Sequence, residues 1–266
     1  MAAVKRSPFG SLKRAFARNA SIVVVLILWE LTTRTGLVNN FLLPPLSDVL
    51  RRAAEDVANG DIPRHVVTTA TCAIVGFASA AVIGVVAGAL MSMSAIVRRI
   101  MEPLVSVAFP IPKISFLPIF VLWFGLGSLS ETTMIAVNCV VPIVSATYLG
   151  TTTVDKYFLW SASNLGTRPH RLFWKIIIPA AAPEIISGLQ VAFPLALIIA
   201  VVTEMLSGAD GLGGYMIHAV RFAQSAKMFA GLLATLLTGL VFIQGFAMLR
   251  RRLLVWHAET APGAGT

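Results

Sequence analysis

The stretch VVTTATCAIVGFASAAVIGVVAGALMSMSAIV, residues 66–97, contains no Asp, Glu, Lys or Arg. A helix needs about 20 mostly apolar residues to cross the apolar core of a bilayer, roughly 30 Å thick. This run is therefore long enough to span a membrane. We expect an all-α integral membrane protein with about six transmembrane helices. Five other segments have a similar composition and complete the set: 20–38, 103–130, 132–154, 185–203 and 228–249.

The overall composition supports the same class of protein. Of the 266 residues, 57% are hydrophobic and only 12% are charged, whereas soluble domains have about 25% charged residues. This excludes an ordinary soluble enzyme. It also argues against a nucleic-acid-binding domain in spite of the net charge of +9, so we expect no nucleic acid partner. Cys72 and Cys139 both lie in apolar runs, which predicts packing roles and no disulfide.

The basic residues indicate how the chain is oriented. If residues 1–19 lie inside, the inside segments contain 14 of the 21 Lys and Arg residues and the outside loops contain 5. Positive residues gather on the cytoplasmic side of membrane proteins, so both termini are expected to lie in the cytoplasm. The basic N-terminal segment resembles a secretory signal but lacks a clear cleavage site. We therefore expect a cytoplasmic segment (1–19), a permease domain (20–255) and a disordered tail (256–266).

Three local patterns predict specific helix contacts. Glu30 and Arg34 are spaced to pair on one helix face. Residues 43–57 predict a short amphipathic helix outside the membrane, with Ser47 as its N-cap. In the 66–97 span, small residues repeat every fourth position and allow close packing against another helix. These small residues are Gly76, Ala80, Gly84 and Gly88.

The 103–130 span combines prolines with a charge. Prolines break the hydrogen bonding of a helix, and irregular backbone at membrane depth is tolerated where it is buried in protein or lines a wet cavity. Lys113 either lines a pathway or extends to the inner interface. We take four polar residues in the spans as candidate pathway-lining groups: Lys113, Ser115, Asn138 and Thr203.

The longest inside loop, about 150–180, predicts an exposed helix–turn–helix that another protein can bind. Gly166 fits the turn after the first helix. Pro179 and Pro183 fit the start of the next. Apolar anchors are expected at Leu165, Leu172, Phe173 and Trp174, with a polar rim at Arg168, Arg171 and Lys175.

This loop resembles the ATPase-coupling loop of ABC importer permeases, which reads Glu-Ala-Ala, three residues, Gly, nine residues, Ile-x-Leu-Pro. Gly166, Ile176 and Pro179 match, and Ile178 replaces the Leu. The acidic position falls on Trp160. The coupling loop that the resemblance predicts comprises Ser161, Ala162, Leu165, Gly166, Arg168, Arg171, Leu172, Phe173, Ile176 and Pro179.

Residues of about 40–255 are similar to the nitrate/sulfonate/taurine branch of that family, through segments such as Leu122-Trp123-Phe124-Gly125 and Pro179-Ala180-Ala181-Ala182-Pro183. The resemblance implies a type I ABC importer permease fold in a bacterial inner membrane and the translocation pathway for a small, anionic solute. It also implies four partners: two copies of a cytoplasmic ATPase that bind ATP and Mg, a periplasmic or lipid-anchored substrate-binding protein, a second permease copy in a homodimer, and membrane lipid.

Segments after the 185–203 span suggest a gate. Glu204, Gly211 and Gly213 are read as a re-entrant element facing the binding protein. The alternative is a glycine-rich loop with solvated carboxylates. The chain lacks a nucleotide-binding P-loop and a catalytic or metal constellation, so we expect no cofactor and no enzymatic activity. A proton-coupled secondary transporter that uses Glu30, Glu131 and Glu204 is the alternative function.

Overall fold

The computed structural model describes residues 8–254, and within them every regular element is helical. The long apolar segments form helices because backbone groups in a bilayer must be bonded within the segment. The elements are α1 (Pro8–Arg34), α2 (Leu46–Ala58), α3 (Asp61–Met93), α4 (Ala95–Ala108), η1 (Lys113–Phe116), α5 (Leu117–Phe124), α6 (Ser128–Thr152), α7 (Lys156–Asn164), α8 (Pro169–Leu172), η2 (Phe173–Ile177), α9 (Ile178–Ser207), α10 (Leu212–Arg221) and α11 (Ser225–Leu253).

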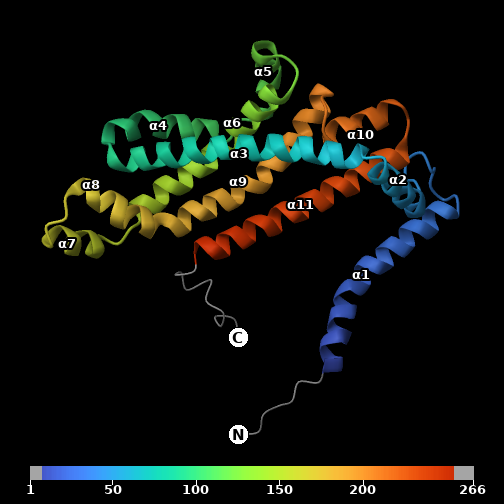
Figure 1. Ribbon diagram of the computed structural model, residues 1–266, viewed down its shortest axis with the longest axis horizontal. Helices are drawn as coiled ribbons and strands as arrows, with labels where there is room; N and C mark the ends of the chain where they lie inside the picture. Colours follow the sequence, from blue (N-terminus) through green and yellow to red (C-terminus); the bar gives the residue numbers. More distant parts are fainter. Residues whose placement is uncertain (1–7, 255–266) are drawn as a thin grey trace, which may run out of the picture.

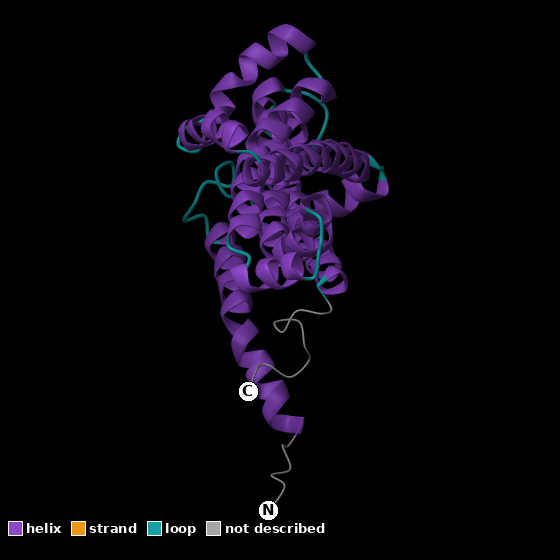
Figure 2. Ribbon diagram, turned by 90° about the vertical axis from the view of Figure 1, so that its left-hand side faces the viewer, coloured by secondary structure: helices purple, strands orange, loops and turns teal. Residues whose placement is uncertain are grey.

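The molecule is elongated and its two ends carry different elements (Figure 1). One end, the α7 end, holds α7, α8, the α3–α4 turn and the C-terminal end of α11. The other, the α10 end, holds α2, α10 and the start of α11. Helix α1 leaves the bundle from the α10 end, and Figure 2 shows the same separation from the side. Two of the segments predicted to lie inside, the start of α4 and the α7–α8 loop, lie at the α7 end, and the end of α11 points toward it, whereas the start of α1 lies apart from it.

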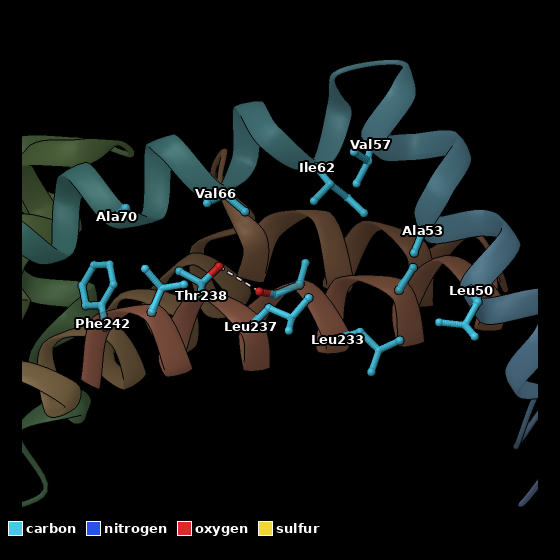
Figure 3. A pocket seen from close by; sticks show the side chains of 13 residues that line it. Leu50, Ala53, Val57, Ile62, Val66, Ala70, Leu233, Leu237, Thr238 and Phe242 are labelled. Carbon is cyan, nitrogen blue, oxygen red and sulfur yellow. Dashed lines mark hydrogen bonds between the residues drawn. The ribbon is translucent and has the colours of Figure 1, made fainter. Parts of the chain in front are cut away.

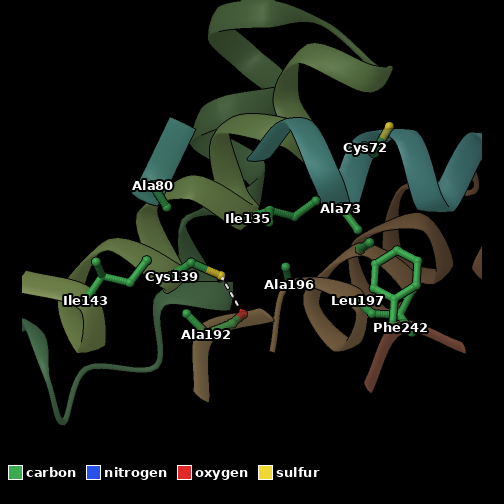
Figure 4. Close-up of a cluster of buried hydrophobic side chains, with 11 residues drawn as sticks. Cys72, Ala73, Ala80, Ile135, Cys139, Ile143, Ala192, Ala196, Leu197 and Phe242 are labelled. Carbon is green, nitrogen blue, oxygen red and sulfur yellow. Dashed lines mark hydrogen bonds between the residues drawn. The ribbon is translucent and has the colours of Figure 1, made fainter. Parts of the chain in front are cut away.

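Helices α3, α6 and α9 form the core (Figure 4). The small residues of α3 face α6: a Cβ added at Gly76 would lie 2.7 Å from Ile135 Cβ, and one at Gly84 would lie 2.8 Å from Ile143 Cβ. Larger side chains would separate these helices, so the predicted close contact is confirmed and lies within one chain. Both cysteines are free and buried, as predicted, and the Cys139 thiol points to the Ala192 carbonyl at 3.4 Å.

The 103–130 run is not one helix. Helix α4 ends at Ala108, and the η1–α5 segment continues at a bend of 97°. Pro110 and Pro112 lie in the break, where their missing N–H groups and fixed φ prevent helix continuation. A second break at Gly125–Gly127 precedes α6. The predicted irregular backbone is confirmed, but the bent pair extends over Ala95–Phe124 and not over 103–130.

The number of spans agrees with the prediction in part. Within the described residues, four helical segments are long and apolar enough to cross a membrane, and the bent α4–α5 pair makes a fifth. The side chains of the first part of α1 lie outside the described residues, so its role as a sixth span stays a prediction. The four segments are Asp61–Met93, Ser128–Thr152, Phe173–Arg221 and Ser225–Leu253.

Helix α2 is amphipathic, as predicted, but Ser47 does not cap it. The helix begins at Leu46 after Pro45. The Ser47 hydroxyl instead donates to Glu30 Oε1 at 2.8 Å, because Glu30 projects from α1 toward the start of α2. Glu30 and Arg34 form the predicted pair, with Arg34 Nε 2.5 Å from Glu30 Oε1.

The apolar face of α2 lines an open groove of about 440 Å³ with α3 and α11 (Figure 3). Leu50, Val66 and Leu237 contribute to its walls. The side chain of Thr238 donates to the Ala234 carbonyl within α11 at 2.8 Å, so it adds little polarity to this surface. The groove is therefore apolar throughout.

Candidate functional site

The predicted coupling loop forms a short helix, a tight turn and a re-entry into the bundle. Helix α7 begins after Asp155, whose carboxylate accepts the Tyr157 N–H at 2.9 Å. It ends at Asn164, and Gly166, two residues later, has φ +77°. The Thr167 N–H donates to the Ala162 carbonyl at 3.1 Å and closes the turn. Glycine adopts this left-handed conformation without the cost that a Cβ adds, so the prediction for Gly166 is confirmed.

The outer surface of this loop is apolar and exposed. Leu165 is 86% exposed and Trp160 is 60% exposed. Tyr157 and Phe158 are also exposed, and the Tyr157 and Trp160 rings lie 5.7 Å apart. Sequence reasoning missed Tyr157 and Phe158, although three aromatic residues within a helix of nine residues was an available indication. We name Tyr157, Phe158, Trp160 and Leu165 the α7 patch.

Phe173 is not an exposed anchor. Its side chain is 4% exposed, because the π-helical segment Phe173–Ile177 turns it into the bundle, while its neighbour Trp174 stays exposed. Ala162 is buried as well. The expectation that Phe173 is an exposed anchor is wrong, because its side chain is buried within the chain itself.

The remaining residues of the predicted coupling loop differ in how exposed their side chains are. Ser161, Arg168 and Arg171 are exposed, and Leu172 and Ile176 are half-buried. Pro179 lies in the first turn of α9, as predicted. Pro183 lies inside α9 and not at its start, since α9 already begins at Ile178. This corrects the prediction for Pro183.

At the α10 end, Glu204 is completely buried near the end of α9. Its Oε2 accepts the Thr69 hydroxyl and the Gly213 N–H, both at 2.9 Å. The Thr69 Oγ accepts the Leu212 N–H at 2.8 Å, and His65 Nδ1 accepts the Gly211 N–H at 3.1 Å. Glu204 and two residues of α3 therefore hold the start of α10. We call Glu204, Thr69 and His65 the α10 clasp.

Gly211 and Gly213 lie so close to neighbouring atoms beside the α10 clasp that no side chain fits at either position. A Cβ on Gly211 would lie 2.2 Å from Glu204 Cδ, and one on Gly213 would lie 2.1 Å from the Val201 carbonyl oxygen. A side chain at either position would displace α10 from Glu204. The alternative of a loop with solvated carboxylates is wrong for Glu204. It holds for Asp210, which is exposed and pairs with Arg64 at 3.3 Å.

A second polar cluster connects α2 to α10. The Tyr215 hydroxyl donates to the buried Asp56 carboxylate, and Arg52 Nε donates to the same oxygen at 3.0 Å. This hydrogen bond raises the pKa of Arg52 above its ordinary value. The Lys227 ammonium lies 4.9 Å from the Tyr215 ring centre. Sequence analysis missed this cluster because its members are far apart in the chain.

The candidate pathway residues have different environments. Lys113 is half-buried at the start of η1, and Ser115 is exposed two positions later. The Asn138 amide donates to the Met134 carbonyl at 2.9 Å. Thr203 is buried and donates to the Ile199 carbonyl at 2.6 Å. Within this single chain, Asn138 and Thr203 bond to their own helices, and Thr203 reaches no surface.

Long apolar helices with exposed apolar faces and a broken span define an integral membrane protein, and a loop with exposed aromatic residues projects at one end. Residues 80–255 match the family described as "Binding-protein-dependent transport system inner membrane component". This match covers more than half of the sequence. The chain belongs to that family.

Relatives and solved structures agree with this assignment. The chain is 26% identical to the taurine transport system permease protein TauC of Escherichia coli (strain K12), over 90% of this chain and 89% of that protein. It is 27% identical to the putative aliphatic sulfonates transport permease protein SsuC of Bacillus subtilis (strain 168), over 88% and 85%. An inward-facing structure of the MetNI methionine ABC transporter has a TM-score of 0.64 at 17% identity, covering 72% of this chain and 95% of that one. The fold is that of an ABC importer permease.

Proposed function

We propose that this chain is the permease subunit of an ATP-driven importer whose solute is a small organic anion of the sulfonate class. The solute class comes from the named activities of two relatives, which transport taurine and aliphatic sulfonates. The family assignment favours this function over a proton-coupled carrier. The chain supplies the pathway, and separate ATPase subunits hydrolyse ATP.

The α7 patch is the observation that carries the docking part of this proposal. Exposed aromatic residues are unfavourable in water and are enriched where proteins bind one another. The patch projects from the α7 end, where the start of α4 with Arg98 and Arg99 also lies. This favours a cytoplasmic position for the α7 end, and the distribution of Lys and Arg along the sequence favours the same side for both termini. The loop continues through η2 directly into α9, so an ATPase that binds the patch can move α9.

Exposed apolar side chains on α4 and α5 support a second copy of the chain as partner. Ile100, Leu104, Leu122 and Trp123 are among these side chains. These side chains lie on the broken span itself, and its α5 part projects from the bundle in Figure 1. A pathway between two copies would enclose this irregular backbone in protein, as a bilayer requires. Membrane lipid covers the remaining apolar faces.

Deletion of residues 160–172 tests the docking assignment. We expect the variant to insert into the membrane but to lose co-purification with its ATPase subunit and ATP-dependent uptake. A finer test replaces Trp160 and Leu165 with Ala, with Phe222→Ala as the matched control, because Phe222 is an exposed aromatic residue at the α10 end. Only the Trp160/Leu165 variant should lose the ATPase. Full ATPase association and uptake after the deletion would refute the assignment.

A further inference from the structure

A polar pocket of about 470 Å³ lies between three segments at the α10 end. Its walls come from α3, from the loop between α5 and α6, and from the loop between α9 and α10. The side-chain oxygens in these walls belong to two carboxylates and three hydroxyl groups. They are those of Thr68, Ser128, Glu131, Ser207 and Asp210.

Glu131 is the unusual member of this set. It lines the pocket and is 2% exposed, and its Oε1 atom is buried without a hydrogen-bond partner. The Cys72 thiol contacts the same carboxyl group. Its position in the first turn of α6 stabilises the helix through the helix dipole. The dipole does not, however, supply a partner for Oε1, and a buried polar atom without a partner is costly.

The charges around the pocket select the sign of a ligand. No Lys or Arg contributes to its walls among the described residues. Arg64 lies outside them and pairs with Asp210, which leaves Glu131 without a basic partner at ion-pair distance. Hydroxyl and carboxylate oxygens accept hydrogen bonds from an ammonium group. An anion in this pocket would face two carboxylates.

We propose that this pocket binds a small cationic group, an ammonium, through Glu131 Oε1 with the pocket hydroxyl groups as further acceptors. The volume fits an organic ammonium compound and exceeds the space that one dehydrated metal ion needs. The extension of this site to the transported solute rests on the proposed function. A solute that carries both a sulfonate and an ammonium group would place its ammonium group in this pocket. The solute class then narrows from a plain anion to a zwitterion.

Binding to the purified full-length permease in lipid nanodiscs tests the site without the ATPase or the binding protein. Radiolabelled methylammonium is the probe, and 2-aminoethanesulfonate and 2-hydroxyethanesulfonate are matched competitors that differ in the ammonium group alone. We expect displacement by the amino compound and not by the hydroxy compound. Glu131→Gln should weaken binding roughly tenfold or more, as expected when a buried charged contact is lost.

Two control variants keep the test decisive. Glu102→Gln removes an exposed carboxylate outside the pocket and should bind methylammonium like the unmodified protein. Ser128→Lys places an ammonium group at the wall of the pocket and should abolish probe binding. Equal binding by Glu131→Gln and the unmodified protein, or displacement by the hydroxy compound as strong as by the amino compound, would overturn the site.

Competition with NaCl distinguishes an organic ammonium ligand from an inorganic cation. If NaCl displaces methylammonium and choline chloride does not, the pocket takes a free inorganic cation, and the extension to cargo is overturned. Binding that is insensitive to NaCl supports an organic ammonium. Failure of the importer assignment is visible separately, because uptake and ATPase co-purification would then be absent while the nanodisc binding persisted.

Discussion

The α10 end of the molecule buries polar side chains that bond to one another within the chain, whereas the α7 end exposes the aromatic side chains of the α7 patch. At the α10 end, Glu204 is buried and accepts two hydrogen bonds. At the α7 end, Trp160 and Leu165 face outward. Contacts within the chain thus hold most of the α10 end together, although one oxygen each of Glu131 and Glu204 is buried there without a hydrogen-bond partner. The α7 end instead presents the surface to which the proposed ATPase would bind.

The largest expected effect is at the α10 end, from Gly213→Ala. Its new Cβ would lie 2.1 Å from the Val201 carbonyl oxygen, so α10 must move away from Glu204. We expect a loss of more than about 3 kcal/mol, measured as the fraction of monodisperse protein after heating. Gly245→Ala is the matched control, because nothing lies within 4 Å of its Cβ position. Equal heat resistance of the two variants would contradict the view that the α10 end is rigid.

The next largest effect distinguishes a buried ring from an exposed ring at the α7 end. Phe173→Ala removes a buried ring and should cost about 3 kcal/mol of stability. Trp160→Ala removes an exposed ring, so we expect unchanged heat resistance but weaker ATPase association. Thermal unfolding and co-purification should separate these two variants. A Trp160 variant that unfolds as early as the Phe173 variant would show that the α7 patch is structural.

A smaller effect is expected from Glu204→Ala in the α10 clasp. The Thr69 hydroxyl and the Gly213 N–H would lose their buried acceptor, at a cost of about 2 kcal/mol. Glu204→Gln retains one acceptor oxygen and should be less destabilised. Hydrogen exchange at the start of α10 measures the loosening directly. Unchanged exchange in the Ala variant would show that the clasp does not hold α10.

The smallest effect is expected from Tyr215→Phe, which removes the hydroxyl that bonds to Asp56. Arg52 still pairs with the Asp56 carboxylate, so we expect a loss of about 1 kcal/mol. Thermal unfolding of the purified protein measures this change. A loss as large as that of Glu204→Ala would mean that the link between α2 and α10 matters as much as the clasp.

Much of the fold followed from local patterns. The uncharged runs predicted α3, α6, α9 and α11 because burial in a bilayer excludes charge over the length of a span. The spacing of Gly76, Gly84 and Gly88 predicted a close helix contact, since a four-residue repeat lies on one face of a helix. Gly166 predicted its turn because few other residues adopt positive φ at low cost.

The parts that sequence reasoning missed depend on how distant segments meet. Phe173 is buried whereas its neighbour Trp174 is exposed, and this difference depends on how the loop packs against the bundle. The prolines predicted the break after α4, but its angle of 97° depends on how α5 packs against α6. The burial of Glu131 and Glu204 depends on neighbours more than 50 residues away along the chain.

The class of protein and the main spans follow from the sequence alone, as does the loop that resembles the coupling loop of ABC permeases. These features depend on the composition and period of continuous segments, which act locally. Only the tertiary structure decided that Glu204 holds α10, that Phe173 is internal and that Glu131 lines a pocket. Helix packing decides whether a carboxylate or a ring is buried. The environment of each of these side chains is therefore fixed only when segments from distant parts of the chain come together.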